Sequence, residues 1–205
     1  MKTRPFRGFT LIELLIAIAI IAILASLVMP TLNYVQTRAK KECTRQEISG
    51  LEAALESYKV DNGGYPQGDS TDSLDAADPT ATARDLLITD SGGVPGLSAA
   101  ASMVLYQSLS GDANADRTID AGERSAVKQI YFPFPPSMLY PKGAGTVEAM
   151  VDPFGNVYGY STRYKADLLS GNPAPGGFNP TFDLWSSADS DKTGATGTAS
   201  WITNW

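Results

Sequence analysis

Residues 8–25 have the sequence GFTLIELLIAIAIIAILA, and this stretch decides the fold of the N-terminal part of the chain. The apolar run extends from Phe9 to Met29 and contains one charged residue, Glu13, near its start. Residues 1–8 form a short leader with three basic side chains. At about 1.5 Å per residue, a helix over this run is roughly 30 Å long, which matches the hydrocarbon core of a bilayer. The pattern predicts a membrane or filament-core helix over residues 9–30.

Glu13 distinguishes this run from simpler apolar segments. A carboxylate within a membrane helix costs about 2.5–3.5 kcal/mol on insertion scales, so its presence indicates a function. A secretory signal peptide has a shorter apolar region that ends in a small-residue cleavage site. An ordinary transmembrane anchor fits the length of the run but leaves Glu13 unexplained. Glu13 is also near enough to the end of the run to extend its carboxylate to the membrane surface.

The stretch from Gly8 to Ala25 is similar to the signature of the type IV pilin and type II secretion pseudopilin superfamily. The resemblance implies that a prepilin peptidase cuts after Gly8, so that Phe9 becomes the N-methylated first residue of the mature chain. It also implies that Glu13 neutralises the α-amino group of a neighbouring subunit during assembly. Pairing these two charges offsets the cost of burying each of them and favours one axial stagger between subunits.

A second helical segment follows the apolar run. Pro30 removes a helical hydrogen bond and predicts a kink or local melting. Beyond it, apolar residues recur at helical spacing, which predicts an amphipathic helix of the head over 31–60. The helix is predicted to end at Asp61-Asn62-Gly63-Gly64, which is followed by Pro66. The apolar positions are Leu32, Val35, Ala39, Ile48, Leu51, Leu55 and Tyr58.

Three further blocks resemble the major pseudopilin of type II secretion. They are residues 48–66, residues 152–160, and residues 182–189 with 202–205. The resemblance implies an α+β, type IV pilin-like fold, in which a long N-terminal α-helix packs on a small antiparallel β-sheet. Residues 61–150 are then a variable connecting region, and residues 151–205 form a C-terminal β-sheet and loop region. Within the second block, the alternation from Val157 to Tyr160 predicts a strand.

Residues 112–123 have the spacing of an EF-hand calcium loop. Oxygen-bearing residues occupy the ligand positions, and calcium prefers six to eight oxygens. Arg117 stands where the pattern has glycine at a sharp turn. Residues 99–109 are predicted to form the entering helix and residues 124–130 a short exiting one. The alternative is an acidic surface turn without a metal. The candidate ligands are Asp112, Asn114, Asp116, Thr118, Asp120 and Glu123.

The resemblance to major pseudopilins implies a second calcium site near the C-terminus. This chain departs from the family pattern there, because Ala199 and Trp201 stand where the family has an acidic pair. Two carboxylates are therefore missing. The candidate ligands in this chain are Leu184 by its carbonyl, Ser187, Asp189 and Asp191.

The composition argues against several other functions. Past Pro30 the chain has 13 basic and 21 acidic residues, so a basic face for nucleic acid is not expected. It contains no histidine and a single cysteine, Cys43, which excludes an internal disulfide. We expect Cys43 to pack as a small apolar residue. Neither a general base nor a nucleophile with a partner is evident, so we expect no enzymatic activity.

The resemblance implies a structural subunit that polymerises into a periplasmic pseudopilus driving protein export by type II secretion. One alternative is a pilin of a type IV pilus for adhesion, motility or DNA uptake. Another is a membrane-anchored calcium-binding module that does not polymerise. The expected partners are other copies of the chain, minor pseudopilins, the prepilin peptidase and an inner-membrane assembly platform. The basic leader predicts a single-pass protein of the bacterial inner membrane with its head in the periplasm.

Overall fold

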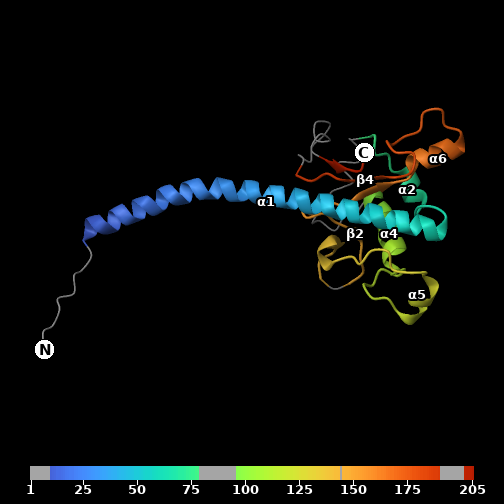
Figure 1. The fold of residues 1–205 in the computed structure, drawn as a ribbon, viewed down its shortest axis with the longest axis horizontal. Helices are drawn as coiled ribbons and strands as arrows, with labels where there is room; N and C mark the ends of the chain where they lie inside the picture. Colours follow the sequence, from blue (N-terminus) through green and yellow to red (C-terminus); the bar gives the residue numbers. More distant parts are fainter. Residues whose placement is uncertain (1–9, 79–95, 144, 190–200) are drawn as a thin grey trace. The chain divides into compact units, whose positions relative to one another are not determined.

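The computed structural model describes residues 10–78, 96–143, 145–189 and 201–205, without the side chains of residues 27–31. The chain divides into two compact units, Met1–Ala39 and Lys40–Trp205 (Figure 1). The second unit is the head. The described helices are α1 Leu11–Asn62, α2 Asp69–Ser73, α4 Leu97–Ser110, α5 Ala121–Ala126, the 3-10 helix η1 Pro136–Met138 and α6 Arg163–Ser170. The described strands are β1 Leu139–Tyr140, β2 Ala149–Met150, β3 Gly159–Ser161, β4 Asp183–Ser186 and β5 Ile202–Thr203.

The long N-terminal helix is confirmed. Its helical backbone continues through Pro30, so the local melting predicted there is wrong. Proline has a φ close to the helical value, and its missing N–H removes one hydrogen bond from a long ladder. The helix ends where the sequence predicts, since Gly63 has φ +79° and its N–H donates to the carbonyl of Lys59 at 2.8 Å. Glycine adopts this left-handed conformation without a Cβ clash.

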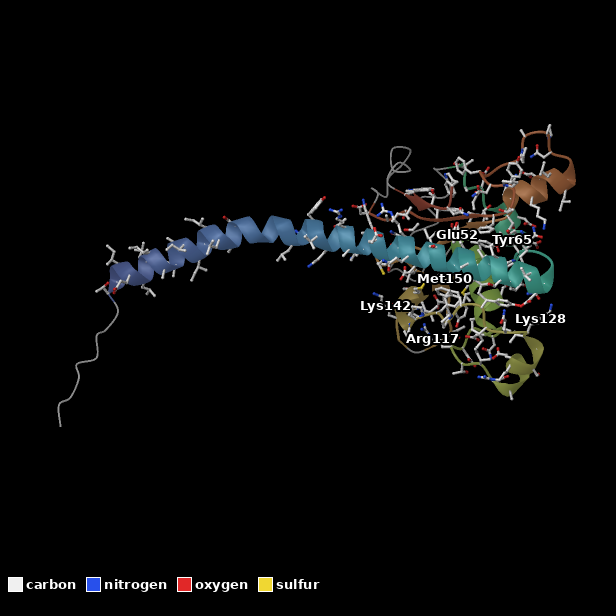
Figure 2. The ribbon with its side chains drawn as sticks, in the orientation of Figure 1. Glu52, Tyr65, Arg117, Lys128, Lys142 and Met150 are labelled. Carbon is white, nitrogen blue, oxygen red and sulfur yellow. The ribbon has the colours of Figure 1, made fainter. Side chains whose placement is uncertain are left out.

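One face of α1 supplies part of the head core. Thr44, Ile48, Leu51 and Leu55 are at most 3% exposed, and their spacing of three and four residues places them on one stripe. They pack with strand residues such as Met150, which lies beside the C-terminal half of α1 in Figure 2. The prediction for Ile48, Leu51 and Leu55 is confirmed.

Leu32 and Val35, two other apolar positions of the predicted amphipathic helix, are helical and exposed. Their side chains are 48% and 55% exposed. Both residues belong to the first unit, Met1–Ala39, whereas the buried stripe of the helix starts at Thr44. Helical periodicity reports which residues share a face, but it does not report where along the helix a partner begins to cover that face.

Two small antiparallel sheets complete the head. β1 pairs with β2, and the second sheet has the order β3-β4-β5. The predicted strand over 157–160 is observed as β3, while Val157 forms an isolated bridge with Val151. An antiparallel sheet with one helix-covered face agrees with the predicted α+β class.

Helix α4 fills the space beside these sheets. It corresponds to the entering helix predicted over 99–109, and it packs against α2, β2 and β3. Eight of its residues are buried. Its sequence is rich in alanine and serine, whose small side chains let neighbouring elements pack close to the helix backbone. Helix α5 begins at Ala121, three residues before the exiting helix that we predicted. In Figure 1, α5 and α6 lie on opposite sides of the C-terminal half of α1. The sequence pattern did not predict α6.

Candidate functional site

The N-terminus of α1 holds Glu13 in a capping arrangement with Thr10. Oε2 of Glu13 accepts hydrogen bonds from the backbone N–H of Thr10 at 2.9 Å and from its hydroxyl at 2.7 Å. In return, the N–H of Glu13 donates to Oγ1 of Thr10 at 3.3 Å. These bonds satisfy donors that a helix leaves unpaired at its start, and the carboxylate complements the helix dipole. The predicted processing residues Gly8 and Phe9 lie outside the described residues.

The first turns of α1 expose an apolar surface. Ten leucine and isoleucine side chains from Leu11 to Leu24 are each at least 53% exposed. They occupy nearly consecutive positions and therefore point to all sides of the helix. A helix that is apolar all round requires lipid or other protein around it. This surface, with Glu13 near its N-terminal end, is therefore expected to be covered by lipid or by another protein.

The structure does not supply a membrane span among its described residues. No helix in the described ranges meets the length and hydropathy that a crossing requires. The segment predicted for that role, residues 9–30, includes Phe9 and the side chains of 27–30, which lie outside the description.

The loop 112–123 is organised around Asp112, which is 1% exposed. Its Oδ2 accepts hydrogen bonds from the hydroxyl of Tyr106 at 2.7 Å and from the N–H of Arg117 at 2.8 Å. Its Oδ1 accepts from the N–H of Asp116 at 3.1 Å. The hydrogen bonds to this carboxylate therefore hold residues 112–117 in a compact turn.

The other predicted ligands form short-range hydrogen bonds. Oδ1 of Asn114 accepts from the N–H of Asp116, and Oδ1 of Asp116 accepts from the N–H and hydroxyl of Thr118. Asp120 caps α5 by accepting from the N–H of Glu123 at 2.8 Å. Oε1 of Glu123 accepts from the N–H groups of residues 113 and 114. The hydrogen bonds from Thr118 lower the pKa of Asp116.

Arg117 adopts the conformation that the glycine position of such a loop requires. Its φ is +73°, in the left-handed region. The side chain extends away from the loop, with Nε donating to the carbonyl of Gly145 at 2.7 Å and Nη2 donating to the carbonyl of Pro141. Figure 2 shows Arg117 among the side chains on the α5 side of α1. These two bonds offset the strain that a non-glycine residue carries at positive φ.

The donor chemistry of this loop suits calcium, which binds carboxylate and carbonyl oxygens. The side chains do not converge, however. Within the described ranges, no three acidic, cysteine or histidine side chains gather as metal ligands. The carboxylates instead accept hydrogen bonds from the loop backbone.

The described members of the C-terminal calcium candidate have other partners. The carbonyl of Leu184 accepts from the N–H of Asn204 at 3.1 Å, as part of the pairing next to β5. Asp189 forms an ion pair with Lys41 of α1 at 2.6 Å. Ser187 is buried, and Asp191 lies outside the described residues.

The turn at Asp152 contains a buried carboxylate that the sequence pattern identified only as a turn former. Asp152 is 3% exposed and accepts hydrogen bonds from the N–H groups of Phe154 and Asn156 and from the hydroxyl of Ser186. Burial raises its pKa, although these donors act in the opposite direction. The Asp-Pro dipeptide signalled the turn, but the contact with Ser186 of β4 depends on the fold.

A partly buried pair joins α1 to the residue before β3. The hydroxyl of Tyr158 donates to Oε2 of Glu47. Burial raises the pKa of Glu47. Cys43 lies one turn earlier, with Sγ 3.6 Å from Oε1 of Glu47, and it is exposed. The prediction that Cys43 packs as a small apolar residue is therefore wrong, because its side chain is exposed on a face of α1 beside the buried stripe.

Comparison with known proteins supports the resemblance over the N-terminal part of the chain. Residues 3–29 match the model of the prokaryotic N-terminal methylation motif, and residues 32–85 match that of type II secretion system protein G. The chain is 44% identical over 66 residues to type II secretion system core protein G of Klebsiella michiganensis, covering 32% of this chain and 46% of that protein. It is 48% identical over 60 residues to core protein G of Escherichia coli, covering 29% and 41%.

Core protein G of Pseudomonas aeruginosa is 41% identical over 66 residues, covering 32% of this chain and 46% of that protein. The chain thus spans less than half the length of the curated relatives it matches. No solved structure matches it. This chain is therefore similar to type II secretion system core protein G, through a match to the N-terminal methylation motif at residues 3–29 followed by a match to the protein G model at residues 32–85.

Proposed function

We propose that the chain is a structural subunit of a type II secretion pseudopilus. The observation that carries this proposal is the exposed apolar surface of residues 11–24, which has Glu13 near its N-terminal end and lies within the match to the N-terminal methylation motif. Apolar side chains on all sides of a helix are stable only when lipid or other helices cover them. In this function the inner membrane covers them before assembly and other copies cover them in the filament.

Glu13 has the central role in this proposal. In the isolated chain its carboxylate is held by Thr10 at the helix N-terminus. After cleavage behind Gly8 by a prepilin peptidase, the new α-amino group of Phe9 provides a positive charge for Glu13 of a neighbouring copy. Pairing removes an uncompensated charge from an apolar environment and favours one stagger between helices. The head then lies in the periplasm, and the role is structural and not catalytic. Minor pseudopilins and an inner-membrane assembly platform are the proposed further partners.

The experiment replaces Glu13 by alanine in the full chain and measures filament assembly and protein export in a host with a type II secretion system. We expect Glu13→Ala to abolish filaments while the head remains folded. Glu42→Ala is the matched control, because Glu42 is an exposed glutamate of the same helix that pairs with Arg45 one turn later. Filaments that form equally well from Glu13→Ala chains would contradict the proposal.

The same experiment separates the alternatives. A type IV pilin also requires Glu13, but its loss would reduce surface pili and leave protein export intact. A calcium-binding module that does not polymerise would form no filament from the unaltered chain. The relatives are named as components of type II secretion, which favours the export function.

We also propose calcium binding by the loop 112–123. The left-handed conformation of Arg117 supports it, since the departure from glycine at this position is accommodated. Asp112, Asn114, Asp116 and Glu123 would hold the ion, with Thr118 contributing its carbonyl and Asp120 a further oxygen. The C-terminal candidate has less support because Asp189 is paired with Lys41.

Calcium titration of the purified full chain in detergent tests this proposal. We expect a single binding event that raises the melting temperature and that is lost in Glu123→Gln. Asp69→Asn is a control at an acidic residue of α2 outside the loop. Unchanged calcium binding in Glu123→Gln would exclude this loop as the site.

A further inference from the structure

An exposed pair of side chains lies on α1 beyond its N-terminal apolar surface. Tyr34 is 67% exposed, and Arg38 is exposed one turn later. Residues four apart share a helix face, so the ring and the guanidinium form one surface. Tyrosine and arginine are enriched among the residues that dominate binding energy at protein interfaces. Lys40 and Lys41 are used by the head of the same chain, because Lys40 lies 5.4 Å from the ring centre of Phe154 and Lys41 pairs with Asp189.

A cavity of about 330 Å³ lies in the head beside the loop 112–123. Three aromatic rings line this cavity, and we call it the aromatic pocket. The rings belong to Tyr106, Phe132 and Phe134. The ring centroids of Tyr106 and Phe134 are 5.1 Å apart, and those of Phe132 and Phe134 are 4.8 Å apart. Aliphatic side chains, among them Ile130, line other parts of the wall. Such a wall favours a flat, amphipathic ring.

The lining of the aromatic pocket also includes polar side chains. They belong to Ser110, Asp112 and Arg117. The guanidinium of Arg117 is directed at the carbonyls of Pro141 and Gly145. A phenol is suited to this combination, because its ring contacts apolar walls while its hydroxyl exchanges hydrogen bonds with polar groups.

The charges of the two surfaces are complementary. On the first surface, Arg38 supplies the positive charge, since Lys40 and Lys41 contact the head of their own chain. Residues 112–124, the acidic loop, carry four acidic and two basic side chains. Asp116 and Asp120 of this loop are exposed. Complementary charge steers association and sets the register of two surfaces.

We propose that Tyr34 of one copy enters the aromatic pocket of a second copy, and that Arg38 of the first copy lies against the acidic loop of the second. The inference rests on the proposed function, and it names a contact that a filament of this chain uses. Every copy carries both surfaces, so the contact is heterologous and repeats from copy to copy. Heterologous contacts that do not close into a ring produce helical filaments.

Disulfide crosslinking between differently tagged full-length copies tests the contact directly. Both copies carry Cys43→Ser, which removes the only native thiol. One copy carries Tyr34→Cys, and the other carries Ile130→Cys at the pocket, where the native side chain is 44% exposed. We expect oxidation of assembled filaments to give a dimer of the two tagged copies. The matched control is Val60→Cys with Ile130→Cys, because Val60 is 82% exposed on the same helix. The control should give at least about tenfold less dimer.

Two substitutions provide an independent measurement. Tyr34→Ala and Arg38→Glu should each lower filament yield by roughly tenfold, as expected for interface anchors, without lowering the melting temperature of the monomer. Val60→Ala should leave the yield unchanged. Normal filaments from Tyr34→Ala, together with no disulfide-linked dimer between the Tyr34→Cys and Ile130→Cys copies, would overturn this contact and leave the proposed function intact. The absence of filaments from the unaltered chain would overturn both.

Discussion

Gly159 lies directly opposite Trp185 in the β3–β4 pairing, and the indole ring occupies the space above the glycine backbone. A Cβ added at position 159 would lie 2.1 Å from Cε2 of Trp185, closer than any van der Waals contact. Trp185 is fully buried and belongs to a core cluster with Leu74, Ala149 and Val157. The absence of a side chain at 159 therefore allows the largest side chain of this cluster to pack.

Gly159→Ala should destabilise the head, because either the indole or the strand must move. Overpacking of a well-packed core typically costs about 1–3 kcal/mol. Thermal unfolding monitored by tryptophan fluorescence measures the change. Gly64→Ala is the matched control, since a Cβ there meets nothing within 4 Å. Equal melting temperatures for the two variants would contradict the packing argument.

Glu47→Gln should change the pH dependence of stability. Burial raises the pKa of Glu47 above its value in the unfolded chain, about 4.3. Protonation of Glu47 therefore stabilises the folded state. This contribution is fully present below about pH 4.3 and is lost as the pH rises through the pKa of the folded state. Glutamine has no proton to lose, so Glu47→Gln should be most favourable relative to the unaltered chain at neutral pH. The advantage should disappear near about pH 4.

Melting temperatures of both proteins between about pH 4 and pH 8 measure this effect. Glu42→Gln, which removes a carboxylate at an exposed position of the same helix, is measured beside it for comparison. A Glu47→Gln profile parallel to that of the unaltered chain would show that Glu47 does not titrate with unfolding.

Arg117 should respond differently to alanine and glycine. Both substitutions remove the bonds from its guanidinium to the carbonyls of Pro141 and Gly145. Alanine keeps the strain of a Cβ at φ +73°, whereas glycine relieves it. We expect Arg117→Gly to be more stable than Arg117→Ala by about 1 kcal/mol, measured by denaturant unfolding. A more stable alanine variant would mean that position 117 does not hold the left-handed conformation in solution.

The ion pair between Lys41 and Asp189 should contribute little to stability. The two side chains are 28% and 38% exposed, and water and salt screen such pairs. We expect Lys41→Met to change the free energy of unfolding by less than about 1 kcal/mol, with a smaller effect in high salt. Asp189→Asn should behave in the same way. A loss of several kcal/mol in Asp189→Asn alone would indicate another role for this carboxylate, such as metal binding.

Features that depend on local physics can be predicted from the amino-acid sequence. Apolar residues at nearly every position from Leu11 to Leu24 specify a helix that needs lipid or protein around it, whatever its neighbours are. Thr10 and Glu13 stand at the spacing of a capping box, and Gly63 follows the last turn of α1 because only glycine adopts φ +79° without strain. The N-terminal signature also carried the resemblance that the family comparison supports.

Features that depend on residues far apart in the chain required the three-dimensional structure. Periodicity placed Ile48, Leu51 and Leu55 on one helix face, but their burial depends on contacts with residues as distant as Met150 and Leu184. Asp189 lay within a predicted calcium site, yet Lys41 of α1 is its partner. The requirement for glycine at 159 arises from the indole of Trp185 on the next strand. Each of these features depends on a distant residue that covers a side chain or supplies a charge. The spacing of residues along the chain does not show which distant residue that is.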